Sequence, residues 1–246
     1  MKHRLIIYLI MPVLVCTVIT NEAIAQSGRP VMQYTVSMPL PSSHYFHVEL
    51  HAQGWNMDTV NFKMPQWMPG YYQIMNYSEA LENFSAKDRK GKELRVDKLN
   101  KNSWQIIAGK NKAFKLVYDI KTTRKFVATS YLDSSHGYIV PVGIFLYVDG
   151  HINTPVSVKV IAGKEWNKTA TGLEPVAGKQ NEFTAPDFDI LYDCPILIGN
   201  LEEFPSFYIS GIEHRFIAYN PGKFDRAKFM DNLKKVVEAS IAVIGD

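Results

Sequence analysis

The residues with the clearest potential for chemistry lie in one short run, His44-Tyr-Phe-His47-Val-Glu-Leu-His51. On a β-strand, His47, Glu49 and His51 would share one face, with neighbouring side chains about 6.5–7 Å apart. Two of them could converge on one zinc ion, but zinc sites use three or four ligands held by supporting hydrogen bonds. We therefore interpret the run as the polar face of an amphipathic strand, with a metal-dependent enzyme at these residues as an alternative.

Two other groups carry reactive side chains without the surroundings that catalysis needs. Glu213 and His214 join an acid to an imidazole, but the His-Glu-x-x-His pattern of zinc proteases is missing and residues 215–218 read as a strand. Cys194 precedes the apolar run 196–198, which is typical of an inert buried thiol. The serine-hydrolase elbow, the Walker loop and the dinucleotide fingerprint are also missing. The sequence therefore predicts no catalytic and no metal-ligating residue in this chain.

The run Pro65-Gln-Trp-Met-Pro-Gly-Tyr-Tyr72 fits neither a regular helix nor a strand. Each proline lacks a backbone donor and restricts the residue before it, while Gly70 allows a turn where a Cβ would clash. The run is therefore predicted to form a shaped loop rich in aromatic side chains. Trp67, Tyr71 and Tyr72 can pack beneath this loop or face a ligand, and packing is the more common use of such rings.

Charge and composition exclude several classes of protein. The chain has 246 residues, with 27 Lys and Arg against 24 Asp and Glu, which gives a formal net charge of +3. Its basic residues do not form the stripe typical of nucleic-acid-binding proteins, and residues 87–93 interleave their own acids as a solvated turn. Nucleic acid is therefore not expected as a partner. A hydrophobic content of 46% can support one large or two smaller domains.

Residues 1–25 have the pattern of a cleaved signal peptide. A basic start at residues 2–4 precedes the apolar stretch 5–19, and residues 23–25 offer the small-x-small cleavage pattern. We therefore expect export, with the mature protein in the periplasm or outside the cell.

A stable membrane anchor is not expected. The apolar stretch is shorter than the roughly 20 residues that span a bilayer, and Pro12 interrupts it. Val15 is too bulky for the position before a lipidated Cys16. Cleavage would leave Cys194 as the cysteine of the mature chain, so we expect no intrachain disulfide.

From Val31 to Asn220 the hydrophobic pattern has a period of two, which places alternate side chains on opposite faces of a sheet. Turn signals such as Asp149-Gly150 separate the periodic runs. We predict a mainly β domain over residues 30–220, built as an antiparallel β-sandwich or a curved antiparallel sheet. The predicted strands are 31–38, 45–51, 59–64, 103–108, 114–121, 156–161, 207–212 and 215–219.

After Pro221-Gly222 the period becomes helical. Apolar residues recur on one face of residues 225–246, namely Phe229, Leu233, Val236, Val237, Ile241 and Ile244. A helix of this length is marginal alone in water, so its apolar face needs a partner surface, either on the β domain or in a second domain. Because the sequence stops at Asp246 directly after the helix, we expect the chain to be a fragment.

Four segments in order resemble the N-terminal region of the glycyl aminopeptidase family of zinc metallopeptidases. The resemblance covers essentially all of the mature chain. The segments are Phe62-Lys-Met-Pro-Gln-Trp-Met-Pro-Gly-Tyr-Tyr72, Ser130-Tyr-Leu-Asp-Ser-Ser-His-Gly-Tyr138, Ala170-Thr-Gly-Leu-Glu-Pro175 and Asp187-Phe-Asp-Ile-Leu-Tyr-Asp-Cys-Pro-Ile-Leu-Ile-Gly199.

The resemblance implies a thermolysin-like layout: an N-terminal β domain, a helical catalytic domain that begins with helix 225–246, and a C-terminal PDZ domain. It implies that zinc belongs to the missing catalytic domain, where a His-Glu-x-x-His helix and a downstream acid hold it and the glutamate acts as general base. Gly211-Ile-Glu-His214 is similar in letters to a catalytic-domain segment of the family, but it lies among the predicted strands and receives no role.

The expected function follows from this layout. The chain would be the non-catalytic N-terminal part of an exported zinc aminopeptidase, which shapes the substrate cleft, docks the catalytic domain and is inactive alone. The resemblance makes Tyr71, Tyr72 and Asp193 candidates for residues that face the cleft. The alternative is a stand-alone exported module that binds peptide or glycan through Trp67, Tyr71 and Tyr72.

Overall fold

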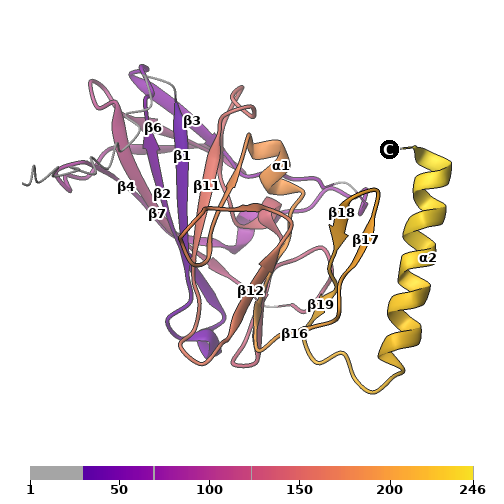
Figure 1. Cartoon of the computed structure of the whole chain (residues 1–246). Coiled ribbons are helices and arrows are strands. Elements are labelled where there is room, and N and C mark those ends of the chain that lie inside the picture. The colour runs from indigo at the N-terminus through magenta and orange to yellow at the C-terminus, as the bar shows by residue number, and fades with distance from the viewer. Residues whose placement is uncertain (1–29, 69, 123, 246) are drawn as a thin grey trace, which may run out of the picture.

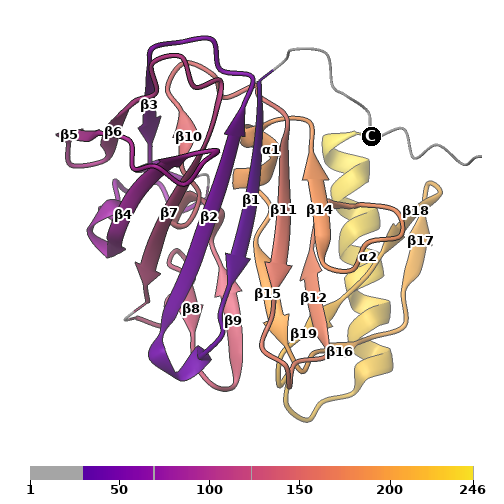
Figure 2. The ribbon, with the colours of Figure 1, turned by 90° about the vertical axis from the view of Figure 1, so that its left-hand side faces the viewer.

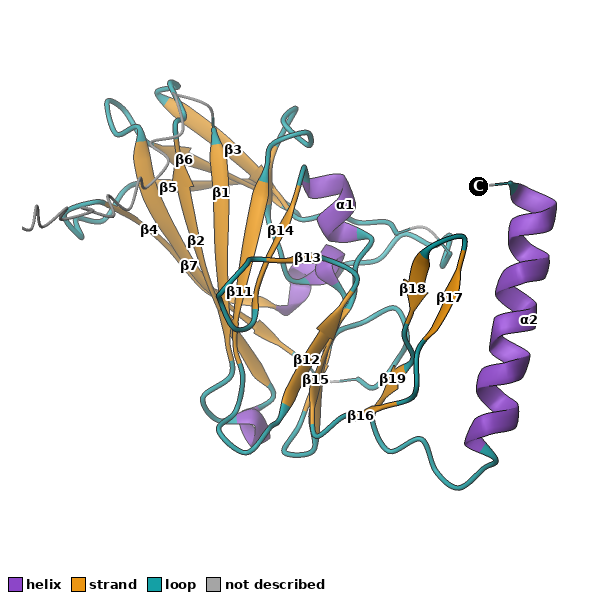
Figure 3. Cartoon of the chain, in the orientation of Figure 1, coloured by secondary structure: helices purple, strands orange, loops and turns teal. Residues whose placement is uncertain are grey.

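The computed structural model describes residues 30–68, 70–122 and 124–245 (Figure 1). The predicted signal peptide, residues 1–25, lies outside the described residues. Strands dominate the described chain, and a long helix follows them (Figure 3). The prediction of a mainly β fold followed by one amphipathic helix is confirmed.

The largest sheet has seven strands, and its central strands follow the predicted period of two. Its order is β13 (Glu174–Pro175), β14 (Glu182–Ala185), β11 (Val156–Ile161), β1 (Val31–Ser37), β2 (Tyr45–Gln53), β7 (Ala113–Lys121) and β4 (Leu81–Asp88). Along the whole length of β2 and β7 every second side chain is buried. The other side chains form the polar outer face of the sheet.

One pair in this sheet departs from the antiparallel prediction. Strands β1 and β11 run parallel, with Met32 opposite Val156 and Ser37 opposite Ile161. Parallel neighbours need a long crossover connection. Here residues 38–155 supply it, and they include the strands of the second sheet.

The second sheet packs across the first and makes the fold a sandwich. Its order is β10 (Tyr147–Val148), β3 (Thr59–Lys63), β6 (Ser103–Ile107) and β5 (Val96–Asn100). Phe62 of β3 meets Phe114 of β7 edge-on, with ring centroids 6.0 Å apart. Phe84 of β4 stacks on Trp104 of β6 at 5.5 Å. Such aromatic pairs contribute about 0.5–1.5 kcal/mol beyond the burial of their surfaces.

A third sheet extends the molecule beyond the sandwich, as Figure 2 shows. Its order is β12 (Lys168–Thr171), β15 (Ile196–Gly199), β9 (His136–Ile139) and β8 (Tyr131–Leu132). Helix α1 (Phe188–Tyr192) leads into β15, and the Asp187 carboxylate caps it by accepting a 2.8 Å hydrogen bond from the Ile190 N–H. Short 3-10 turns occupy Pro41–Ser43, Tyr77–Ala80 and Pro141–Gly143.

Two small two-stranded sheets lie between the third sheet and the long helix (Figure 1). They pair β16 (Glu202–Glu203) with β19 (Ile217–Ala218) and β17 (Phe207–Ile209) with β18 (Ile212–His214). The predicted single strands 207–212 and 215–219 are therefore wrong in extent. Ser210 and Gly211 have φ values of 50° and 79°, which turn the chain back between β17 and β18.

Helix α2 (Arg226–Ile244) is held mainly at its first turn. The Asp225 carboxylate caps it by accepting from the Lys228 N–H at 3.0 Å, and Phe229 packs against Phe216 at 4.8 Å. The pair between Arg226 and Glu202 is solvent-exposed and adds little. The aromatic contact is therefore the main anchor.

The apolar face of α2 is only partly covered by the described residues beyond that anchor, and Leu233, Val237 and Ile241 are half-buried. Met230 is buried, but Val236 is 61% exposed and Ile244 is 84% exposed. Figure 1 shows the helix standing at one edge of the molecule. No helix in the described part of the chain is long and apolar enough to cross a membrane.

Close packing at Gly143 gives a prediction about stability. A Cβ at this position would lie 2.9 Å from Cδ1 of Tyr77, and both residues are buried. Because the Tyr77 hydroxyl is fixed by a 2.9 Å hydrogen bond to the Ala128 carbonyl, Gly143→Ala should lower the free energy of unfolding by about 1–3 kcal/mol. Chemical denaturation of the chain measures this change.

Gly163→Ala is the matched control. Its Cβ would meet Pro41 and Trp166 at an ordinary 3.5 Å, so stability should stay constant or rise by less than about 1 kcal/mol. Equal losses in the two variants would contradict the argument.

Candidate functional site

His47, Glu49 and His51 lie on the outer face of β2, as the alternation predicts. Nδ1 of His47 lies 2.5 Å from Oδ1 of Asp119 on β7. The Lys115 ammonium donates to Glu49 at 3.2 Å, and Nε2 of His51 lies 3.7 Å from the same carboxylate. These side chains therefore pair with one another along and across the sheet.

Neither the histidines of segment 44–51 nor the pair Glu213 and His214 has the geometry of a zinc site. Asp119 already occupies Nδ1 of His47, and His44 uses its Nδ1 on the Leu132 carbonyl at 2.6 Å. Glu213 and its neighbour His214 on β18 point to opposite faces of the hairpin. Within residues 30–68, 70–122 and 124–245, no group of three or more His, Cys, Asp or Glu could hold a metal ion.

The predicted aromatic loop keeps two rings at the surface. Trp67 is 40% exposed and Tyr72 is 75% exposed, with ring centroids 6.0 Å apart. Tyr72 also has a φ of 57°, which is uncommon for a large side chain. Tyr71 turns the other way, and its ring meets Phe126 edge-on at 5.3 Å.

Asp193 belongs to a different element from the tyrosines. It is exposed at the C-terminal end of α1, where its N–H bonds to the Leu191 carbonyl. No hydrogen bond, ion pair or ring contact among the described residues joins Asp193 to Tyr71 or Tyr72. The two tyrosines thus share the loop but contact different rings, Asp193 lies on a separate element, and the cleft-facing role of all three stays a prediction.

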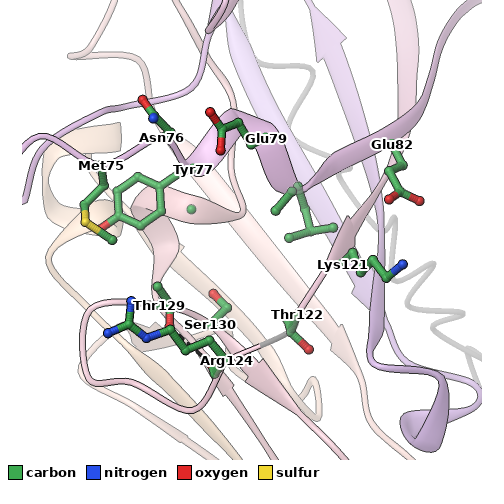
Figure 4. A pocket seen from close by; sticks show the side chains of 13 residues that line it. Met75, Asn76, Tyr77, Glu79, Glu82, Lys121, Thr122, Arg124, Thr129 and Ser130 are labelled. Carbon is green, nitrogen blue, oxygen red and sulfur yellow. Dashed lines mark hydrogen bonds between the residues drawn. The ribbon is translucent and has the colours of Figure 1, made fainter.

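Residues 124–131 line two hollows in the surface. The first, which we call the Arg124 hollow, has a volume of about 360 Å³. Figure 4 shows Tyr77 and Glu79 on one side of it and Arg124, Thr129 and Ser130 on the other. The Arg124 guanidinium lies 4.4 Å from the ring centroid of Phe126. Phe126 in turn lines the second hollow.

The second hollow, which we call the His136 hollow, combines aromatic walls with a cation and a buried histidine. It has a volume of about 470 Å³, and its walls include Lys125, Phe126, Tyr131, His136, Tyr138 and Tyr219. His136 is buried and stacks on Tyr219, with centroids 4.1 Å apart and planes 14° from parallel. The Lys125 ammonium lies 4.9 Å from the Tyr131 ring centroid.

Asp133 organises the polar side of the His136 hollow. Its Oδ1 accepts hydrogen bonds from the Ser135 N–H, the Ser135 hydroxyl and the His136 N–H, and its Oδ2 accepts from the Tyr131 hydroxyl. Burial raises the pKa of this carboxyl, but the hydrogen bonds from Ser135, Tyr131 and the backbone outweigh it and hold the pKa well below its usual range. Asp133 is therefore ionised at neutral pH.

The same network sets the state of His136. Nδ1 of His136 lies 2.9 Å from the Ser135 hydroxyl oxygen. Burial, aided by the nearby Lys125 ammonium, lowers the pKa of His136, and Asp133 offsets only part of this effect. The imidazole is therefore neutral at pH 7.

Sequence reasoning did not single out His136 or Asp133 as site residues. Both lie in segment 130–138, which carries part of the family resemblance. The signal that could have found them is the Asp-Ser-Ser-His order, because an aspartate commonly binds the backbone N–H two residues later in a tight turn. Tyr219, which completes the hollow, lies more than eighty residues away and only the fold brings it there.

Comparison with known proteins gives a family and a related structure. The model of the family described as the Peptidase M61 N-terminal domain matches residues 33–200. The crystal structure of an aminopeptidase N family protein from Idiomarina loihiensis has 27% sequence identity and a TM-score of 0.78. This match covers 86% of the chain and 36% of that structure, so the chain spans about a third of that relative.

Other matches are more distant. An M1 zinc metallopeptidase from Deinococcus radiodurans matches at 11% identity and a TM-score of 0.43, over 76% of the chain and 46% of that structure. A search of curated protein sequences found no match.

The lowered pKa of His136 predicts how stability depends on pH. Between the unfolded histidine pKa of about 6.5 and the lower folded value, the unfolded chain binds a proton that the folded chain does not. The free energy of unfolding should therefore fall as the pH falls from 7 through this window. Chemical denaturation at a series of pH values measures the slope.

His136→Gln should reduce this slope, whereas His51→Gln, at an exposed position on β2, should keep it. Asp133 does not affect this slope, because its lowered pKa places its own contribution to the pH dependence of stability at more acidic pH. An unchanged slope in His136→Gln would contradict the assignment.

Proposed function

Because the chain belongs to the Peptidase M61 N-terminal domain family, we propose that it forms the N-terminal part of an exported zinc aminopeptidase. In this role it shapes the substrate cleft and docks the catalytic domain. The family match over residues 33–200 is the observation that carries the proposal. The related structure from Idiomarina loihiensis, an aminopeptidase N family protein, supports it.

Docking of a catalytic domain suits the exposed apolar surfaces at one edge of the chain. Helix α2 exposes Val236 and Ile244, and the neighbouring hairpin exposes Tyr208 and Ile212 at 62% and 64%. Contact of large apolar side chains with water is unfavourable, and exposed apolar patches are typical of protein–protein contact surfaces. A downstream domain that covers them would remove this cost.

The substrate cleft is proposed to lie along the aromatic loop and the two hollows. Tyr71 and Phe126 connect the loop to the His136 hollow, while Tyr72 faces solvent. Asp193 remains a cleft candidate from a separate element. Zinc, with its ligands and general base, is proposed to belong to the catalytic domain, because the described donors of this chain do not fit a metal ion.

A stand-alone exported module that binds peptide or glycan is the second candidate. The exposed rings of Trp67 and Tyr72 favour it, since exposed aromatic side chains commonly stack on ligands. Reading the coding sequence downstream of Asp246 separates the two candidates. A His-Glu-x-x-His motif there supports the aminopeptidase, and a stop codon there supports the module.

The aromatic loop should contribute to substrate binding in the full-length protein. Tyr72→Ala removes an exposed ring, so folding should be unaffected, and the KM for peptide substrates should rise about fivefold with little change in kcat. Steady-state hydrolysis of a series of peptides measures both constants.

Ile161→Ala is the control, because Ile161 is 48% exposed on β11, which pairs with β1 and β14 and not with β3, the strand that precedes the loop. Its constants should equal those of the unmodified enzyme. Equal KM values for Tyr72→Ala and Ile161→Ala would remove the loop from the proposed cleft.

Export predicts a defined mature N-terminus. Cleavage after Ala25 should give a protein that begins at Gln26, because residues 23–25 have the small-x-small pattern. Intact mass of the protein isolated from the cell envelope or medium measures the cleavage site. A form without residues 1–25 should stay in the cytoplasm, and an exported protein that retains Met1 would contradict the prediction.

A further inference from the structure

We propose that the His136 hollow binds an uncharged peptide group of the substrate together with an apolar or aromatic side chain. The peptide N–H would donate to Nε2 of His136, and the peptide carbonyl would accept from the Lys125 ammonium. This inference rests on the proposed function and adds a class of ligand for one part of the cleft.

The hydrogen-bond chain from Asp133 fixes the tautomer of His136. The Ser135 hydroxyl has one proton, and it donates that proton to the ionised Asp133 at 2.5 Å. The same oxygen lies 2.9 Å from Nδ1 of His136, so Nδ1 must carry the hydrogen and donate to it. Nε2 then has an unprotonated lone pair, which can accept a hydrogen bond from a donor on a ligand.

The charges around the hollow keep this acceptor neutral. Lys125 is the cation on its wall, and the Asp133 carboxylate is engaged by Ser135 and Tyr131. The pKa of Tyr131 is raised by its hydrogen bond to Asp133, and burial raises that of Tyr138. These two phenols stay neutral at pH 7.

This combination selects against charged ends of a peptide. An α-ammonium group would be repelled by Lys125, whose charge already lowers the pKa of His136. A carboxylate would satisfy Lys125 but would leave Nε2 facing a second acceptor. An internal peptide group offers one donor and one acceptor and so matches both positions.

The walls define the side chain that accompanies this group. Phe126, Tyr131, Tyr138 and Tyr219 present aromatic surface around about 470 Å³, which is within the size range of small-molecule sites. An apolar or aromatic side chain would bury its surface against these rings. Because the free amine is disfavoured here, the hollow would hold a residue that follows the first peptide bond.

Binding of three matched probes tests the proposal on this chain. The probes are N-acetyl-phenylalanine N-methylamide, which is uncharged, phenylalanine N-methylamide, which is a cation, and N-acetyl-phenylalanine, which is an anion. NMR of the imidazole nitrogens reports on Nε2 of His136 directly. We expect the uncharged probe to shift the Nε2 resonance at millimolar concentration and to bind at least about tenfold more tightly than the cation.

Two variants separate the contributions. His136→Phe keeps a flat ring against Tyr219 but removes the acceptor, so the affinity for the uncharged probe, followed through Tyr219 resonances, should fall about tenfold. Lys125→Met should weaken binding of the uncharged probe and reduce the discrimination against the cation. His51→Gln, away from the hollow, should leave all three affinities unchanged.

Three outcomes measured on this chain would overturn the proposal. They are equal affinities for the uncharged and cationic probes, unchanged binding in a folded His136→Phe variant, and the lack of any Nε2 shift. Binding to this chain but not to the full-length protein would also overturn it, because the catalytic domain would then occupy the hollow. Peptide hydrolysis by the full-length protein is a separate measurement, so the proposed function can hold where this inference fails.

Discussion

Burial of the chain between Ile139 and Val148 is the constraint on which the rest of the structure depends. Every residue of this segment except Tyr147 is buried, although irregular backbone inside a core leaves polar groups to satisfy. The buried hydroxyls of Tyr118 and Tyr34 donate to the carbonyls of Ile144 and Leu146 at 2.9 Å and 2.6 Å. Two tyrosines of the large sheet thereby supply hydrogen bonds that two buried backbone carbonyls of this segment would otherwise lack.

The segment 139–148 also positions residues that line the Arg124 hollow and the His136 hollow. Before it, β9 carries His136 beside Asp133, so the start of the buried path fixes one wall of the His136 hollow. At its centre Gly143 lets the Tyr77 ring approach closely, and the Tyr77 hydroxyl holds the Ala128 carbonyl. Residues 124–131 are therefore positioned from within the core rather than by surface contacts alone.

Local pattern predicted the elements whose burial alternates regularly. Strands β2, β7 and β11 and helix α2 agree with their periods because one face of each is apolar. The local pattern did not predict two features of the fold. The turn at Ser210 and Gly211 divides an apolar run that reads as one strand. The parallel pairing of β1 with β11 depends on the path of the whole crossover between them. The site around His136 was not predicted, because stacking with Tyr219 needs the tertiary fold.

The His136 hollow and the exposed helix are connected through one short pair of strands. Tyr219, which stacks on His136, directly follows β19, and β19 pairs with β16. Glu202 of β16 forms the ion pair with Arg226 at the start of α2. Phe216, which directly precedes β19, packs against Phe229 of α2 with ring centroids 4.8 Å apart. The strand pair β16–β19, with two residues in each strand, therefore lies between the Tyr219 wall of the hollow and the first turn of α2.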